Sequence, residues 1–370
     1  MKLICSKANL LKGVNIVSKA VPTRTTMAIL ECILIDASSN EIKLMANDTE
    51  LGIETKVEGD IEERGVIALD AKIFSDIVRK LPDSDVTIST DPSLKTVITC
   101  EKAKFNIVGK SGDDFSYIPN VEKKDSIVMS QFTLKELVRQ TIFSIADNDN
   151  NKIMTGEYFE IRENQLRVVS MDGHRISIRN IELKNNYEDK QVIVPGKTLQ
   201  EISRIVPGNA DDDVVISITD NHIVFDFDTT TVVSRLIEGK YFRIDQMMSS
   251  NYETKVVISK RELLECIDRS TLLVKEGDKK PIIMNVQDSK MELKINSFIG
   301  SMDEEIDIEK EGRDIMIGFN PKFFIDALRV IDEDTVTLYM VNPKAPCFIK
   351  DDEGKFIYMI LPVIFNNAAN

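Results

Sequence analysis

Apolar residues recur along the chain with two different spacings. Over residues 7–20, 134–145 and 260–273 they fall three or four positions apart, the spacing that predicts amphipathic helices. Elsewhere apolar and polar residues alternate, as strands with one buried face require, over residues 30–35, 86–89, 158–161, 214–218, 282–286 and 335–339. The pattern predicts an α+β protein in which helices cover one face of antiparallel sheets.

One strand-and-helix pattern occurs three times. Residues 66–82 read as a short strand followed by a helix that ends near a proline, and the pattern returns over residues 192–207 and 315–331. Equivalent positions stand 125 residues apart, at Leu81, Val206 and Ile331, and again at Asp76, Glu201 and Asp326. A repeat of this length is a whole domain rather than a solenoid unit. The sequence therefore predicts three domains, each with two helices and roughly eight strands: residues 1–125, 126–250 and 251–370.

The composition argues against a membrane protein, a disulfide framework and a zinc site. The longest apolar stretch, residues 356–365, is only about ten residues long, whereas a membrane-spanning helix needs roughly 20. At the N-terminus Lys7 interrupts the apolar residues before they form a run long enough for a signal peptide, so we expect a cytoplasmic protein. The five cysteines are scattered without a CxxC pair. We therefore expect no metal and no cofactor.

The charge is unevenly distributed. A net charge of −14 speaks against a general affinity for nucleic acid, yet the predicted helices hold 15 Lys and Arg against 7 Asp and Glu. They carry +8, which leaves −22 for the rest of the chain. These helices are residues 7–20, 71–81, 134–145, 196–206, 260–273 and 321–331. Basic helices in an acidic chain indicate a protein that attracts DNA phosphates without reading bases. The alternative is that these lysines are merely solvated, good helix formers.

The run Asp172-Gly-His-Arg175 invites a catalytic interpretation, with His174 as a base that Asp172 orients. The sequence contains no nucleophile elbow, no Gly-rich phosphate loop and no carboxylate–histidine metal cluster to complete such a site. A plain structural turn at Asp-Gly is a second interpretation. A third follows from the wider pattern of motifs.

Three motifs stand in order within the triplicated chain: Asp172-Gly-His-Arg175, Leu236-Ile-Glu-Gly239 and Tyr358-Met-Ile-Leu-Pro-Val363. With the triplication, they resemble the beta subunit of bacterial DNA polymerase III over the full length of the chain. The resemblance implies a DNA clamp fold: a head-to-tail homodimer whose six domains form a ring, with helices lining the hole and sheets forming the outer wall. It also implies a non-catalytic processivity factor that encircles duplex DNA and tethers the replicative polymerase.

The resemblance further implies a groove for short peptide motifs. Its partners would be the polymerase III catalytic subunit, the clamp loader, and other polymerases and repair proteins. Methionines suit a surface that meets many partners, and Arg175 and Asn320 would hydrogen-bond to the peptide backbone. The implied lining is Met154, Met171, Gly173, His174, Arg175, Ile176, Phe242, Met247, Asn320, Phe323, Pro346, Met359, Leu361, Pro362 and Val363.

Two more surfaces follow from the resemblance. The resemblance implies a DNA contact at Arg24, and the basic charge of the predicted helices adds Lys12 and Lys197. One side of the dimer seam is an alternating edge strand with two nearby apolar residues: Lys102, Lys104, Phe105, Ile107, Ile77 and Leu81. The other side is acidic, with one leucine: Asp303, Glu304, Glu305 and Leu273. Head-to-tail closure would cover the edge strand, and opposite charges would set its register.

Some positions depart from the family pattern and leave the preferred peptide motif open. Met171 stands where a small or β-branched polar residue is frequent, Phe242 where proline is usual, and Ile364 where arginine is often found. The tail, residues 366–370, runs past the usual end. Two other classes stay open from the residues alone. A DNA-modifying enzyme using His174 would show metal- or nucleotide-dependent turnover, and a tandem-domain scaffold that does not bind nucleic acid would be monomeric.

Overall fold

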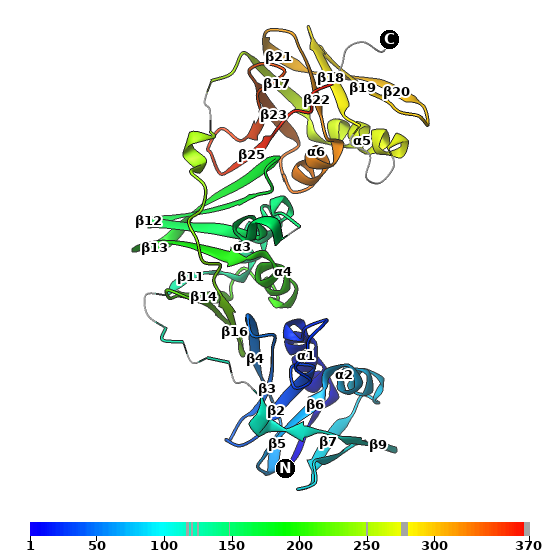
Figure 1. Cartoon of the computed structure of the whole chain (residues 1–370), viewed down its shortest axis with the longest axis vertical. Coiled ribbons are helices and arrows are strands. Elements are labelled where there is room, and N and C mark those ends of the chain that lie inside the picture. Colours follow the sequence, from blue (N-terminus) through cyan, green and yellow to red (C-terminus); the bar gives the residue numbers. More distant parts are fainter. Residues whose placement is uncertain are drawn as a thin grey trace. The chain divides into compact units, whose positions relative to one another are not determined.

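The computed structural model describes residues 1–115, 118–119, 121–123, 126–147, 149–248, 251–274 and 280–365, and the tail 366–370 lies outside them (Figure 1). The chain forms two compact units. Unit 1 comprises Met1–Leu134 and Lys197–Leu236, and unit 2 comprises Lys135–Gly196 and Ile237–Asn370. Among the described residues, no helix is both long and apolar enough to cross a membrane.

The described residues contain six α-helices: α1 (Lys7–Val17), α2 (Ala71–Lys80), α3 (Gln131–Arg139), α4 (Gly196–Ile205), α5 (Lys260–Ser270) and α6 (Pro321–Leu328). Short 3₁₀ turns are η1 (Ser18–Ala20), η2 (Gly112–Asp114), η3 (Ile142–Ser144), η4 (Asp149–Thr155), η5 (Ile244–Gln246) and η6 (Thr271–Leu273). Five of these helices begin directly after a strand, and α6 is separated from the end of β22 by one residue. The side chain that ends the strand caps several of them, as Asp70 does by accepting a hydrogen bond from Ile73 N at 2.8 Å.

The predicted helices are found, and α3 differs most from its predicted bounds, at both of its ends. The sequence pattern predicted a helix over residues 134–145, but α3 begins at Gln131. The hydroxyl of Ser130 accepts a hydrogen bond from Thr133 N at 3.1 Å, which starts the helix one turn earlier. At the other end Thr141 leaves the helical conformation, and its hydroxyl donates to Leu137 O at 2.7 Å. The remaining residues form the separate turn η3.

Unit 1 contains two antiparallel sheets, in the orders β5-β1-β7-β8-β9 and β10-β6-β2-β3-β4-β16-β15-β14-β11. Their strands are β1 (Lys2–Ser6), β2 (Cys32–Asp36), β3 (Ile42–Asn47), β4 (Leu51–Val57), β5 (Asp60–Glu63), β6 (Val66–Asp70), β7 (Asp85–Thr90), β8 (Lys95–Cys100), β9 (Ala103–Val108), β10 (Lys110–Ser111), β11 (Ile127–Ser130), β14 (Asp213–Ile218), β15 (His222–Phe227) and β16 (Thr230–Arg235). Helix α1 buries Leu10, Val14 and Val17, the three-or-four spacing expected of its sequence.

Unit 2 also contains two antiparallel sheets, in the orders β12-β13-β25-β24-β23-β17-β21 and β20-β19-β18-β22. Their strands are β12 (Gly156–Met171), β13 (Arg175–Pro195), β17 (Thr254–Ser259), β18 (Ile282–Gln287), β19 (Lys290–Asn296), β20 (Ser301–Asp307), β21 (Glu309–Gly312), β22 (Ile315–Phe319), β23 (Thr335–Met340), β24 (Cys347–Lys350) and β25 (Phe356–Ile360). Buried residues of the third-repeat strands, such as Val256, Met284 and Leu338, meet α5 and α6 in one apolar core.

Two strand pairs join neighbouring sequence repeats. In unit 1, β4 pairs with β16, so the first and second repeats share a sheet. In unit 2, β13 pairs with β25, so the second and third repeats share another. Because the second repeat contributes strands to both sheets, its residues are divided between the two compact units. The architecture is the α+β arrangement of helices and antiparallel sheets that the sequence predicted.

Candidate functional site

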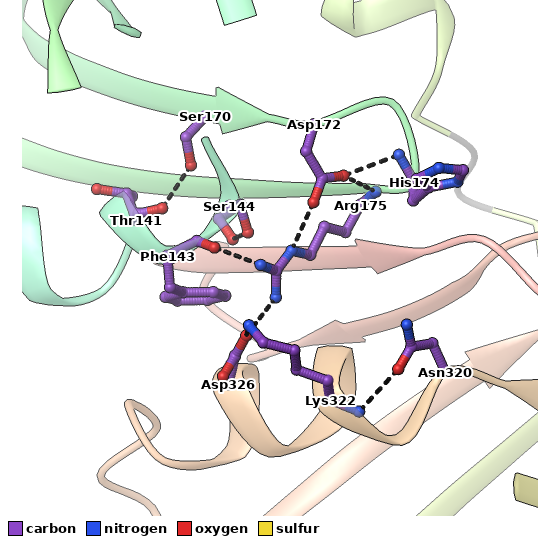
Figure 2. A network of polar contacts seen from close by, with 11 residues as sticks. Thr141, Phe143, Ser144, Ser170, Asp172, His174, Arg175, Asn320, Lys322 and Asp326 are labelled. Atoms are coloured by element: carbon purple, nitrogen blue, oxygen red, sulfur yellow. Dashed lines mark hydrogen bonds and ion pairs between the residues drawn. The ribbon is translucent and has the colours of Figure 1, made fainter. Parts of the chain in front are cut away.

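The Asp172-Gly-His-Arg175 run forms the turn between β12 and β13 (Figure 2). Asp172 Oδ1 accepts hydrogen bonds from the backbone N–H groups of His174 and Arg175 at 2.9 and 3.0 Å. Gly173 has a φ of +88°, which favours glycine. The Asp172 carboxylate therefore holds the turn, and the His174 ring instead stacks on Phe323 with ring centroids 6.2 Å apart. This is not the geometry of a carboxylate that orients a catalytic base.

The Arg175 side chain ties this turn to α6 and is only 7% exposed. Its Nε donates to Asp172 Oδ2 at 3.0 Å, and its Nη1 donates to Asp326 Oδ2 at 2.7 Å. Its Nη2 donates to the carbonyl oxygen of Phe143, and the guanidinium lies 4.6 Å from the ring centroid of Phe323, within cation–π range. Figure 2 shows the guanidinium between the two carboxylates. All three nitrogens have acceptors within the chain, so in this structure Arg175 holds the turn in place rather than presenting donors to a peptide.

Six of the predicted groove residues meet in one apolar cluster. Its buried members among them are Met171, Ile176 and Met359, and its partly buried members are Met154, Phe242 and Leu361. Sequence reasoning missed Tyr158 and Tyr241, which pack in the same cluster with their rings stacked 4.8 Å apart. The adjacent aromatic pair Tyr241-Phe242 was the signal that could have found them.

A cavity of about 430 Å³ borders this cluster at Phe242 and is lined by both tyrosines. Arg167, on β12, crosses it and forms ion pairs with Asp245 at 2.7 Å and with Glu160 at 3.7 Å. Asp245 lies in η5, so these contacts fasten the connection that carries Phe242 to the sheet. No charged residue of this group was singled out from the sequence.

The other predicted groove residues are not members of this cluster, and Phe323 packs against the separate core of the third repeat. Asn320 caps α6 by accepting a hydrogen bond from Lys322 N at 3.0 Å. The C-terminal segment is fixed at two points, where Leu361 N donates to His174 O at 2.9 Å and Val363 N donates to Gly318 O at 2.8 Å. Two more, Pro346 and Pro362, are half-buried, and Met247 is 39% exposed. Ile364, one of the departures from the family pattern, is 83% exposed.

Glu157, also on β12, is a buried acid that the sequence analysis did not single out. Its side chain is fully buried, and neither carboxyl oxygen has a hydrogen-bond partner of good geometry among the described residues. Burial raises its pKa to about 8, an effect that the nearby Thr141 hydroxyl offsets only in part. The folded protein therefore holds this carboxyl in its neutral form at pH 7.

Replacing Glu157 by methionine is expected to stabilise the protein above about pH 5. Between the ordinary pKa of 4.5 and about 8 the folded state keeps a proton that the unfolded state has lost, so the wild-type unfolding free energy falls as pH rises. Each pKa unit corresponds to about 1.4 kcal/mol, and with structural relaxation we expect Glu157→Met to gain roughly 2–4 kcal/mol at pH 8. Urea unfolding from pH 5 to 8 measures this. The exposed residue Glu188 supplies the control, since Glu188→Gln should keep the wild-type dependence of the unfolding free energy on pH. If Glu157→Met also keeps that dependence, Glu157 is not the buried neutral acid.

The predicted DNA-contacting residues differ in their pairing. Lys12, on α1, and Arg24, in the loop after η1, are exposed and have no ion pair among the described residues. Lys197, at the start of α4, donates to the Asp48 carboxylate instead. The positive charge at Lys197 is therefore partly neutralised within the chain.

One side of the predicted seam contains the edge strand β9 of unit 1. Phe105 is 38% exposed on this strand, and Val108, which the sequence analysis did not include, is 75% exposed. Lys104 is also exposed, whereas Ile107 is half-buried. These four residues give the edge an apolar character with a positive charge.

Three other residues predicted for this side lie elsewhere. Lys102 is not in the strand, because Cys100 pairs with Ala103 and leaves Glu101 and Lys102 as the two-residue turn of the β8–β9 hairpin. Ile77 and Leu81 expose only 8% and 4% of their surface and belong to the core of unit 1. They therefore offer little surface to a partner.

The other predicted side includes β20, the edge strand of the four-stranded sheet in unit 2. Each acidic residue already has a cation within the chain: Asp303 pairs with Lys294 at 3.2 Å, Glu305 with Lys290 at 2.5 Å, and Glu304 with Arg269. Leu273 is half-buried. The sequence analysis missed the most exposed apolar residues near this edge, which are Leu272 at 78%, Phe298 at 97% and Ile299 at 55%.

Among the described residues, no group of His, Cys, Asp and Glu side chains could hold a metal ion. The five cysteines are all buried thiols. Burial raises the pKa of the Cys5 and Cys266 thiols to about 12, so these two are protonated at neutral pH.

Comparison with known proteins gives a consistent result along the whole chain. Family models of the DNA polymerase III beta subunit match its N-terminal domain at residues 1–119, its central domain at 128–242 and its C-terminal domain at 245–364. The beta sliding clamp of Staphylococcus aureus (strain Mu50 / ATCC 700699) is 35% identical over 356 residues, which cover 93% of this chain and 94% of that protein.

Solved structures agree. A putative DNA polymerase III beta subunit from Eubacterium rectale is 82% identical with a TM-score of 0.97, and the sliding clamp of Bacillus subtilis is 31% identical with a TM-score of 0.95. Each match covers 99% of this chain and 100% of the other. The chain belongs to the family of bacterial beta sliding clamps, the non-catalytic processivity subunits of DNA polymerase III.

Proposed function

We propose that this sliding clamp closes as a head-to-tail homodimer in which the repeats 1–125, 126–250 and 251–370 of each chain form a six-domain ring around duplex DNA. The observation that carries the proposal is a pair of complementary sheet edges. Strand β9 presents Phe105 with a lysine beside it, and the β20 edge is acidic with Leu272 exposed nearby. An apolar edge strand needs a cover, and pairing β9 of one copy with β20 of another covers both. Made twice, this contact closes a two-fold ring.

Within such a ring the six helices, which together carry a net positive charge, face the DNA, and the acidic remainder of the chain forms the outer wall. Phosphate contacts made by lysine side chains carry no sequence information, so the clamp binds any duplex and slides along it. Retention then depends on topology, and direct affinity is weak and screened by salt. The clamp acts in this way in the cytoplasm, where it holds the replicative polymerase on its template.

The partners dock at the apolar cluster of unit 2. Met154, Phe242 and Leu361 are its partly buried members and offer flexible apolar surface to a short peptide motif. The Asp172–Arg175 turn and α6 flank it, joined through Arg175. The polymerase III catalytic subunit, the clamp loader, and other polymerases and repair proteins bind there in competition with one another.

Loss of the clamp on DNA cleavage tests encirclement. Clamp loaded by its clamp loader onto nicked circular duplex should stay bound through gel filtration at about 0.15 M salt, where exposed charges further apart than about 8 Å are screened. Cutting the circle once should lower the retained clamp at least tenfold, because the ring slides off the ends. Protein roadblocks bound at both ends of the linear DNA should restore retention. Equal retention on open linear and circular DNA would show ordinary surface binding and end the ring proposal.

A further inference from the structure

The positive charge of the helices is shared unequally among the three repeats. In the first repeat, α1 with η1 and α2 hold six Lys and Arg against one acid, a net charge of +5. In the second, α3 with η3 and α4 carry +2. In the third, α5 with η6 and α6 with its cap residue Arg329 hold five cations against four acids, a net charge of +1.

Ion pairing within the chain increases the difference in available positive charge between the first and third repeats. In the first repeat, Lys12 on α1 and Lys72 and Lys80 on α2 are exposed and have no ion pair among the described residues. The single acid of this helix pair, Asp76, lies 3.3 Å from Arg79 and leaves the lysines unpaired. Their charge is therefore available to an external anion.

The cations of the third repeat have partners instead. Within or between its helices, Arg261 pairs with Glu265 at 3.1 Å, Lys322 with Asp326 at 2.9 Å and Arg329 with Asp268 at 3.2 Å. Arg269 pairs with Glu304 of β20, and Lys260 Nζ donates to Ile331 O at 2.7 Å. A phosphate that approaches these helices meets carboxylates beside every ion-paired cation, so its net attraction is small.

The two helices of the first repeat form one surface. The hydroxyl oxygens of Ser18 and Ser75 lie 3.4 Å apart, so the end of α1 meets α2, and Figure 1 shows the two helices side by side. On α1, Lys12 is exposed while Leu10 and Val14 are buried, so the lysine lies on the solvent face. Arg24, in the loop that follows, adds another exposed cation.

We propose that the helix pair α1/α2 of the first repeat, with Arg24, carries most of the phosphate contacts of this clamp, and that α5/α6 contributes little. The inference rests on the proposed encirclement of DNA. Direct electrostatic binding of the duplex is then mainly a property of the first repeat, although all three repeats have a helix pair at equivalent sequence positions.

Two double variants with the same charge change test the proposal on the full-length clamp. Lys12→Ala/Lys80→Ala removes two unpaired lysines, and Arg261→Ala/Arg329→Ala removes two paired arginines of comparable exposure. Binding to a short fluorescent duplex is measured by anisotropy at several salt concentrations from about 0.02 to 0.1 M, where phosphate contacts are weakly screened. Because each lost phosphate contact lowers the slope of log K against log salt by about 0.9, the lysine variant should lose about 1.8 and the arginine variant well under 0.9.

A comparable or larger loss of slope in the arginine variant would overturn the asymmetry. So would an unchanged slope in the lysine variant. The ring proposal is tested separately, by whether the wild-type clamp stays on circular DNA and leaves cut DNA. That retention depends on ring closure, whereas the salt slope depends on the phosphate contacts, so either proposal can fail without the other. Both double variants should keep wild-type retention on circular DNA once they are loaded.

Discussion

Placing a carboxylate at Phe105 is expected to split the dimer into folded monomers. In a closed ring this side chain is buried twice, once in each seam. Full burial of a phenylalanine contributes about 1.5–3 kcal/mol, and only 38% of the Phe105 surface remains for a seam to cover, so two seams lose about 1–2 kcal/mol of apolar burial. Burying an unpaired carboxylate in each seam costs several kcal/mol more, so the dimer dissociates more than 1,000-fold more readily. Light scattering at micromolar concentration should give twice 41.8 kDa for the wild type and 41.8 kDa for Phe105→Asp. A wild-type monomer under these conditions would exclude the ring.

A mixing experiment distinguishes a head-to-tail seam from any other dimer. Leu272→Asp damages the opposite side of the seam and should also be monomeric. Each variant keeps one intact side, so mixing the two should form a heterodimer through a single seam, weaker than the wild type because the second contact no longer closes the ring. Phe132→Asp is the matched control. It places the same charge at a phenylalanine that is 52% exposed on α3, outside the seam, and should leave the dimer intact. Failure of the two monomeric variants to combine would rule out this pairing of surfaces.

Removing the Arg175 guanidinium is expected to weaken both the fold of unit 2 and the binding of partner peptides. Arg175→Ala leaves Asp172 without its cation, while Asp326 keeps Lys322 at 2.9 Å. Breaking a buried ion pair on one side costs about 3–5 kcal/mol, and the remaining lysine returns part of this, so we expect the unfolding free energy to fall by about 2–4 kcal/mol. Urea unfolding measures that loss. Because the turn and α6 flank the proposed groove, the affinity for a fluorescent peptide with the cognate polymerase motif should fall at least tenfold.

Three further variants separate positioning from general damage. Arg179→Ala removes an arginine four residues further along β13 and should leave both the unfolding free energy and the peptide affinity close to those of the wild type. Arg175→Lys keeps the charge but loses the forked geometry, so it should recover part of the stability and little of the peptide affinity. Leu361→Ala removes apolar surface from the cluster itself and should weaken peptide binding about tenfold with the Arg175 contacts intact. Wild-type peptide affinity in both Arg175→Ala and Leu361→Ala would mean that partners dock elsewhere.

Much of the fold followed from local rules. Apolar spacing predicted three of the six helices, because a helix on a sheet must bury every third or fourth residue whatever its neighbours are. The repeated strand-and-helix pattern predicted the other three. Alternation predicted strands such as β7 and β23 in the same way. The start of α3 was misplaced because it depends on the hydroxyl of Ser130, and a cap of one hydrogen bond leaves little trace in a periodic pattern.

The chemistry of the candidate surfaces depended on contacts that no local pattern records. Arg175 was expected to serve a bound peptide, but it contacts Asp326, which is 151 residues away in the sequence. Asp303, Glu304 and Glu305 of β20 were expected to face a partner's lysines, yet each of these three has a cation on a neighbouring strand or helix. Pairing of this kind decides how much charge a surface shows, because it depends on which side chains the sheet brings within about 4 Å of one another.

The sequence by itself determined that three copies of one α+β domain follow one another and that their helices taken together are basic while the rest of the chain is acidic. Both are properties of residue order and residue type, which folding does not change. Only the tertiary structure decided which strands end their sheets, that Ile77 and Leu81 are core residues while Leu272 is exposed, and which helix cations remain unpaired. These properties depend on packing between segments far apart in the chain, where burial and ion pairing are set by the neighbours that each side chain acquires on folding.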